Sequence, residues 1–169
     1  AIFHLFTHAF FKAALFLGAG SVHHAAGTFN MKYMGGLRRH MPWTYWSMII
    51  ASVSLAGLFP FSGFWSKDEI LGHAAEVGTT TATIVLALGL IAALMTAFYM
   101  FRAIFLTFHG EWRGGGEREE EEAKAAGEPA PVGNTHSHLA ESPWLMIGPV
   151  ALLAVLAIVV GFFSNPTVD

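Results

Sequence analysis

The sequence of 169 residues contains no cysteine and few charged residues. The lack of cysteine excludes disulfide bonds, iron–sulfur ligation and thiolate metal sites among these residues. Only 12% of the residues are charged, against roughly 25% in an ordinary soluble domain. The net charge is −3, and no basic stripe with interleaved aromatic residues is present, so nucleic acid is not expected as a partner. In contrast, 54% of the residues are hydrophobic, which indicates a membrane protein.

Four segments are long and apolar enough to cross the hydrocarbon core of a bilayer, which takes about 20 residues. They cover residues 2–19, 43–77, 81–108 and 144–163. Pro60 interrupts the second segment, because proline removes a helical hydrogen bond and clashes with the preceding turn. The sequence therefore predicts an all-α, polytopic membrane protein with about four transmembrane helices, the second broken at Pro60.

The connections between these segments carry most of the charge. Residues 20–42 contain three cations, and residues 112–141 combine basic residues with a run of glutamates and three consecutive glycines. Such a composition predicts a flexible, charged loop at 112–141, between a transmembrane core at 1–111 and a further transmembrane helix within 142–169. With four crossings, both basic connections lie on the same side, which the positive-inside rule places in the cytoplasm.

Three titratable side chains interrupt the first apolar segment at intervals of four residues. His4, His8 and Lys12 follow one inclined stripe of a helix, because each step of four residues drifts by only about 40°. A neutral imidazole accepts a proton at one nitrogen and donates from the other, so the stripe suits a proton relay. The alternative is structural: the histidines bond to the backbone inside a bundle, and Lys12 reaches the nearer interface.

The second group of candidates surrounds the helix break. Pro60 and Gly63 mark the break, and Lys67 and Asp68 follow it. Broken helices at membrane depth occur where they face protein or a wet cavity, and transporters bind ions there. Because adjacent helical residues do not face each other, we expect Lys67 and Asp68 to have separate partners. The alternative is that both mark the far membrane interface.

Several ordered motifs resemble a known family. Residues 6–21 (FTHAFFKAALFLGAGS) resemble the histidine- and lysine-bearing helix of the antiporter-like subunits of respiratory complex I, the NADH–quinone oxidoreductase. Residues 60–71 (PFSGFWSKDEIL) resemble the discontinuous helix of the largest of these subunits. Three shorter motifs are also similar to the family: 34–37 (MGGL), 97–102 (AFYMFR) and 107–111 (TFHGE).

The resemblance assigns roles to the candidate residues. It implies that Lys12 is the central lysine of a proton half-channel, with His4 and His8 bridging toward it. Lys67 and Asp68 would form the terminal pair, from which protons leave to the outer side. The first half-channel of the family and its later spans are absent from these residues, so we expect the chain to be a fragment from the C-terminal half of such a subunit.

The resemblance also implies a setting. It indicates a membrane subunit of a proton-translocating oxidoreductase in the bacterial plasma membrane, with the mitochondrial inner membrane as the alternative. We expect other membrane subunits and the lipid bilayer as partners. We expect neither a redox cofactor nor a metal in this chain, whereas NADH, FMN, iron–sulfur clusters and quinone belong to partner subunits.

Two other functions stay open. The large subunit of multisubunit Na⁺/H⁺ antiporters shares this half of the fold, and a structural membrane anchor would pack the same residues without moving ions. A lysine–histidine relay favours H⁺ over Na⁺, because ammonium and imidazolium cannot coordinate Na⁺.

Overall fold

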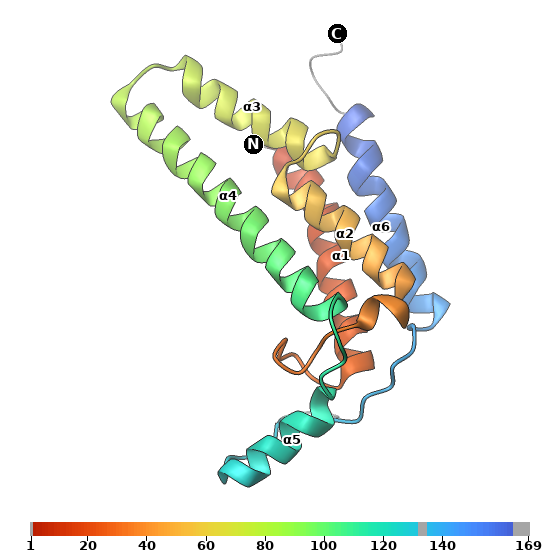
Figure 1. The fold of residues 1–169 in the computed structure, drawn as a ribbon. Coiled ribbons are helices and arrows are strands. Elements are labelled where there is room, and N and C mark those ends of the chain that lie inside the picture. Colours follow the sequence, from red (N-terminus) through yellow and green to blue (C-terminus); the bar gives the residue numbers. More distant parts are fainter. Residues whose placement is uncertain (1, 132–134, 164–169) are drawn as a thin grey trace.

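The computed structural model describes residues 2–131 and 135–163, and every regular element in these ranges is helical (Figure 1). The prediction of an all-α fold is confirmed. The elements are α1 (Ile2–Ala26), the short 3₁₀ helix η1 (Leu37–Arg39), α2 (Pro42–Ala56), α3 (Ser62–Glu76), α4 (Thr80–Phe108), α5 (Gly115–Ala126) and α6 (Trp144–Phe163).

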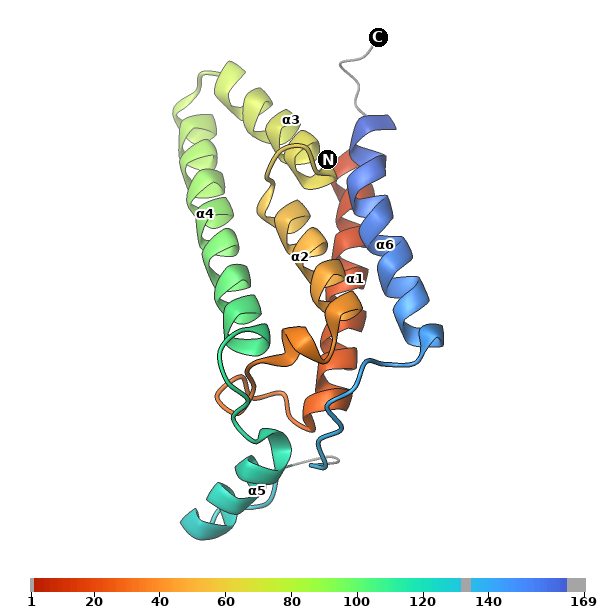
Figure 2. The same ribbon diagram turned by 45° about the vertical axis from the view of Figure 1, so that its right-hand side comes forward.

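The chain traverses the bundle four times. In Figures 1 and 2, α1 runs down, α2 and α3 lead back up, α4 descends and α6 rises again. Helices α1, α2 and α6 each pack against the other two, while α4 lies along α2 and α3 at one edge. The connections before α2 and before α6 consequently meet at the same end of the bundle (Figure 1), as the predicted topology requires.

The second crossing consists of two short helices. Helices α1, α4 and residues Trp144–Gly161 of α6 are each long and apolar enough to span a membrane. Helices α2 and α3 have 15 residues each, or about 22 Å at 1.5 Å per residue, which is less than the roughly 30 Å of the hydrocarbon core. Only in succession do they cross it, so the expected count of about four crossings agrees with the structure.

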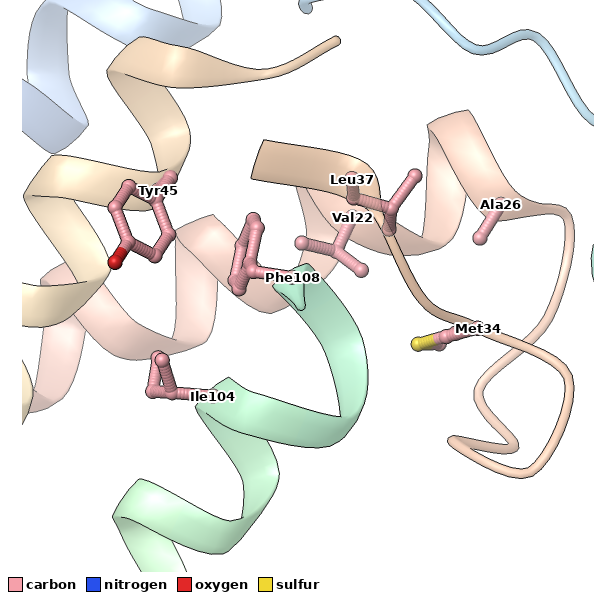
Figure 3. Packing of buried hydrophobic residues seen from close by; sticks show 7 residues of the cluster. All are labelled: Val22, Ala26, Met34, Leu37, Tyr45, Ile104 and Phe108. Carbon is pink, nitrogen blue, oxygen red and sulfur yellow. The ribbon is translucent and has the colours of Figure 1, made fainter. Parts of the chain in front are cut away.

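Two apolar clusters hold the bundle together. One lies near the end where α4 finishes, where seven buried residues from α1, the following connection, α2 and α4 converge (Figure 3): Val22, Ala26, Met34, Leu37, Tyr45, Ile104 and Phe108. The other cluster joins α1, α2 and α6 through Phe11, Ala14, Leu15, Ala51, Leu55 and Ala157. The small alanines let the three helices approach closely, as at helix interfaces in membranes.

The expectation of a flexible loop at 112–141 is wrong for residues 115–126, which form helix α5. The sequence from Glu117 to Ala126 is rich in Glu, Arg, Lys and Ala, all strong helix formers. Two ion pairs at i,i+4 spacing add support, Arg118–Glu122 at 3.2 Å and Lys124–Glu120 at 2.5 Å. Of the three glycines that suggested a loop, Gly114 is the N-cap and the other two form the first turn of the helix, while Gly127 caps its C-terminus in the left-handed conformation.

Helix α5 is docked onto the first connection rather than extending freely. The ammonium of Lys32 lies 2.7 Å from the Glu122 carboxylate, and the Tyr33 hydroxyl donates to the same carboxylate at 2.9 Å. Thr28 donates to Glu119. Both basic connections of the predicted cytoplasmic side are therefore tied into one polar cap.

Candidate proton-pathway site

His4 connects the first helix to the second half of the broken crossing. Its Nδ1 lies 2.8 Å from the hydroxyl of Ser66 on α3, and Thr7, one turn further along α1, donates to the same hydroxyl at 3.1 Å. Thr7 and Ser66 are both fully buried. The contact joins residues 62 positions apart in the sequence, so a residue predicted from the relay stripe is held beside the helix break.

The predicted stripe on α1 is present, but its members face different surroundings. The rings of His4 and His8 lie 5.9 Å apart between centroids, and both residues are partly buried. Lys12 lies on the exposed side of α1, and no hydrogen bond or ion pair is recorded for it in residues 2–131 and 135–163. The drift of about 40° per four residues explains the divergence, since Lys12 is turned by about 80° from His4.

One of the carbonyls at the C-terminus of α2 accepts a hydrogen bond from Lys67. Gly57 takes the left-handed conformation and donates to Ser54 O at 3.0 Å, while Leu58 donates to Val53 O at 3.2 Å. These two bonds form a Schellman motif, which satisfies two of the last carbonyls of the helix. The ammonium of Lys67 donates to the next one, Leu55 O, at 2.5 Å. A cation at this end of a helix is also favoured by the helix dipole.

The two glycines beside Pro60 allow close approach. A Cβ at Gly57 would lie 2.9 Å from Lys67 Cδ, and a Cβ at Gly63 would collide with the carbonyl oxygen of Ser54. Gly63 also donates its N–H to the Ser54 hydroxyl at 3.3 Å. Gly63 was predicted as part of the helix break, and it is the point where the start of α3 lies directly against the end of α2.

Asp68 lies apart from Lys67. It is exposed on α3, and within the part of the chain that the structure describes no hydrogen bond or ion pair is recorded for it. The partner of Lys67 is a backbone carbonyl and not Asp68, whereas the separate partner expected for Asp68 is not found among the described residues. The next residue, Glu69, is partly buried, and one of its carboxylate oxygens has no hydrogen-bond partner within residues 2–131 and 135–163.

His4 and Lys67 share one cavity of about 210 Å³ between α1, α3 and α4. A site needs about 10–15 Å³ of such volume to hold one water molecule, so this cavity has room for several. Its other lining residues are almost all apolar: Ile70, Leu71, Gly89, Ala92, Ala93 and Thr96. His4 and Lys67 thus line the same space beside the break, and this space is large enough for water.

Sequence reasoning missed the hydroxyl and carbonyl groups of this site. Thr7, Ser66 and Leu55 O carry the contacts of His4 and Lys67, yet none was a candidate. Ser66 directly precedes Lys67, and a buried serine inside a transmembrane segment is a signal that points to a hydrogen bond. Residues 2–131 and 135–163 contain no group of three or more His, Asp or Glu side chains placed to hold a metal ion.

Comparison with known proteins shows to which protein family the chain belongs. Residues 1–97 match the family described as the transmembrane region of NADH:quinone oxidoreductases and Mrp antiporters. The chain belongs to this family, and it is part of a multi-pass membrane protein.

Individual relatives show which subunits of this family the chain is similar to. The chain is 45% identical over 175 residues to the NAD(P)H-quinone oxidoreductase chain 5 of Picosynechococcus sp., covering 98% of this chain and 26% of that protein. It is 41% identical over 173 residues to the NADH-quinone oxidoreductase subunit L of Rhodobacter capsulatus, covering 95% of this chain and 22% of that protein. The chain therefore spans about a quarter of the length of these relatives. The bacterial relatives agree with the predicted location in the bacterial plasma membrane.

Proposed function

We propose that this chain is part of the L-type membrane subunit of an NADH–quinone oxidoreductase and carries part of a proton-translocation half-channel. The observation that supports this most is the cavity beside the helix break, because His4 of α1 and Lys67 of α3 both line it. Each of these groups can bind and release a proton, and the cavity is large enough for the water that would join them.

The path that we propose runs along α1 and ends at the break. A proton passes from Lys12 to His8 and His4, then through water in the cavity to Lys67, and Asp68 accepts it toward the outer side. The rings of His4 and His8 are neighbours at 5.9 Å, so one further water or a small ring rotation connects them. Lys12, on the exposed side of α1, is the first proton donor of this path.

Lys67 is a suitable gate because its protonation state alters the end of α2. As an ammonium it donates to Leu55 O. As a neutral amine it lacks the positive charge that is favoured at a helix C-terminus. Release of the proton therefore weakens the contact with Leu55 O. The same contact argues for H⁺ as the transported ion. Transporters with broken helices bind cations at the C-terminus of a half-helix, and here the ammonium of Lys67 occupies that position.

The proposal assigns no redox chemistry to this chain. NADH, FMN, iron–sulfur clusters and quinone belong to partner subunits in this scheme, and their reactions drive the charge movement from a distance. The other membrane subunits and the surrounding lipid are the direct neighbours of this chain.

The test is the number of protons translocated per NADH oxidised in the assembled, full-length complex. Lys12→Met and Lys67→Ala should each lower it strongly while assembly is kept, and Lys12→Arg should also fail because arginine stays protonated. Lys32→Ala is the matched control, since it removes the same charge from a cytoplasmic ion pair. Normal stoichiometry in Lys12→Arg would contradict protonation cycling at Lys12.

A second function is favoured by the family itself, whose description includes Mrp antiporters. In that case the chain would exchange Na⁺ for H⁺ without flavin-containing partners. Purification of the intact assembly separates the two, because only the oxidoreductase brings NADH-oxidising, iron–sulfur subunits with it. A purely structural anchor would tolerate all the substitutions above with unchanged transport.

A further inference from the structure

The hydroxyl of Ser66 is the central atom of a small buried network between α1 and α3. It lies 2.8 Å from His4 Nδ1, accepts from Thr7 at 3.1 Å and reaches the carbonyl of Gly63 at 3.4 Å. Ser66 and Thr7 have no exposed surface. Three polar groups therefore meet one hydroxyl in a place that the rest of the bundle shields.

The Ser66 hydroxyl can form a hydrogen bond with His4 in both the charged and the neutral state of the ring. A serine hydroxyl has one proton and two acceptor lone pairs. When it donates to Gly63 O, its lone pairs accept from Thr7 and from His4 Nδ1–H, which suits an imidazolium or the Nδ1–H tautomer. When the hydroxyl turns to donate to Nδ1, the neutral ring carries its proton on Nε2. Ser66 thus remains bonded to His4 whether or not the ring is charged.

We propose that Ser66, braced by Thr7, is a positioning residue for proton transfer at this site. By accepting from Nδ1–H in both the imidazolium and the neutral Nδ1–H tautomer, it leaves Nε2 as the nitrogen that gains and loses the proton exchanged with the cavity shared with Lys67. The inference rests on the proposed function, and it adds a residue that the relay of charged side chains does not contain.

A merely structural role is the competing explanation. Ser66 could tie α1 to α3 and nothing more, because its hydroxyl on α3 bonds to Thr7 and His4 of α1. Its bond to Gly63 O is a local helical contact of the kind that buried serines make. The two roles differ in one respect. The tie that Thr7 makes to Ser66 remains whatever residue occupies position 4, whereas a positioning residue acts only through the imidazole of His4.

The experiment uses the full-length protein in the assembled complex, with the initial rate of proton pumping and the protons per NADH as readouts. Ser66→Ala removes the hydroxyl, Ser66→Thr restores one, and His4→Ala is combined with Ser66→Ala in a double-mutant cycle. Ser52→Ala is the matched control, because Ser52 is equally buried and its hydroxyl has no hydrogen-bond partner among the residues that the structure describes. Lys67→Ala reports separately on the proposed function.

We expect Ser66→Ala to slow pumping about three- to tenfold, the range that the net loss of one hydrogen bond gives. Ser66→Thr should recover most of the rate, Ser52→Ala should match the unmodified protein, and Ser66→Ala should add nothing once His4 is alanine. An equal loss with and without His4, or an unchanged rate in Ser66→Ala, overturns the inference. If His4→Ala pumps too slowly for the cycle, failure of Ser66→Thr to recover the rate overturns it. If Lys67→Ala pumps normally, the proposed function itself has failed.

Discussion

Replacement of Lys67 by methionine separates the structural contribution of this lysine from its role in transport. Methionine keeps the length and apolar body of the side chain but removes the ammonium that donates to Leu55 O at 2.5 Å. The carbonyl is then left without its partner at the end of α2, where the Schellman bonds have already used the available N–H groups. We expect the turn that ends α2 to open more readily.

The size of the effect follows from the contact. A hydrogen bond to a charged group contributes about 1.5–3 kcal/mol when well shielded. Lys67 is only half-buried, so solvent screening reduces this contribution to just below that range, about 1.4 kcal/mol. That free energy corresponds to about a tenfold change in an opening equilibrium. Hydrogen exchange at the amides of Gly57 and Leu58, which bond to Ser54 O and Val53 O, should accelerate about tenfold in Lys67→Met.

Two further variants complete this prediction. Lys67→Arg keeps a cation for the carbonyl, so exchange at the break should stay close to normal while pumping is lost. Lys32→Met removes a lysine from the opposite end of the bundle and should leave both readouts unchanged. Unaltered exchange in Lys67→Met would show that the contact with Leu55 O contributes nothing, and normal pumping in Lys67→Arg would refute proton release at this lysine.

Three other predictions concern packing, pH and topology. Gly161→Ala should destabilise the bundle by about 1–3 kcal/mol in thermal unfolding, because its Cβ would lie 2.6 Å from Ser62 Cα. Gly148→Ala should not destabilise it, because the space around Gly148 is open. Hydrogen bonds from Lys32 and Tyr33 hold the pKa of Glu122 below its usual 4.5. The docking of α5 is therefore stabilised above that pH and should weaken as the pH falls below it, which faster amide exchange in α5 would show. Unchanged exchange at low pH would contradict this. Single cysteines at Val77 and Glu121, probed with an impermeant thiol reagent in right-side-out vesicles, should label only at Val77, and labelling at Glu121 would overturn the cytoplasmic assignment.

The overall fold was predictable because its signals are local. Apolar length gave the crossings, and Pro60 gave the break, which the structure places between Ala56 and Ser62. Helix α5 was missed for a physical reason: the three glycines and the run of like charge at its start outweighed the helix propensity of the residues that follow. The ion pairs of Arg118 with Glu122 and Lys124 with Glu120 follow an i,i+4 pattern that a closer reading of the spacing would have detected.

The contacts of the site could not be predicted in the same way, because they depend on how helices pack. Periodicity places His4 on a face of α1, but only packing brings Ser66, 62 residues away, to its Nδ1. The partner of Lys67 is still less visible in a sequence, since every residue has a carbonyl oxygen and no residue type marks a free one. It becomes identifiable only by accounting for each acceptor at the end of α2: Val53 O and Ser54 O are used by the Schellman motif, and Leu55 O is available. A half-buried ammonium in a broken transmembrane helix is thus best explained by asking which backbone carbonyls the break leaves unpaired.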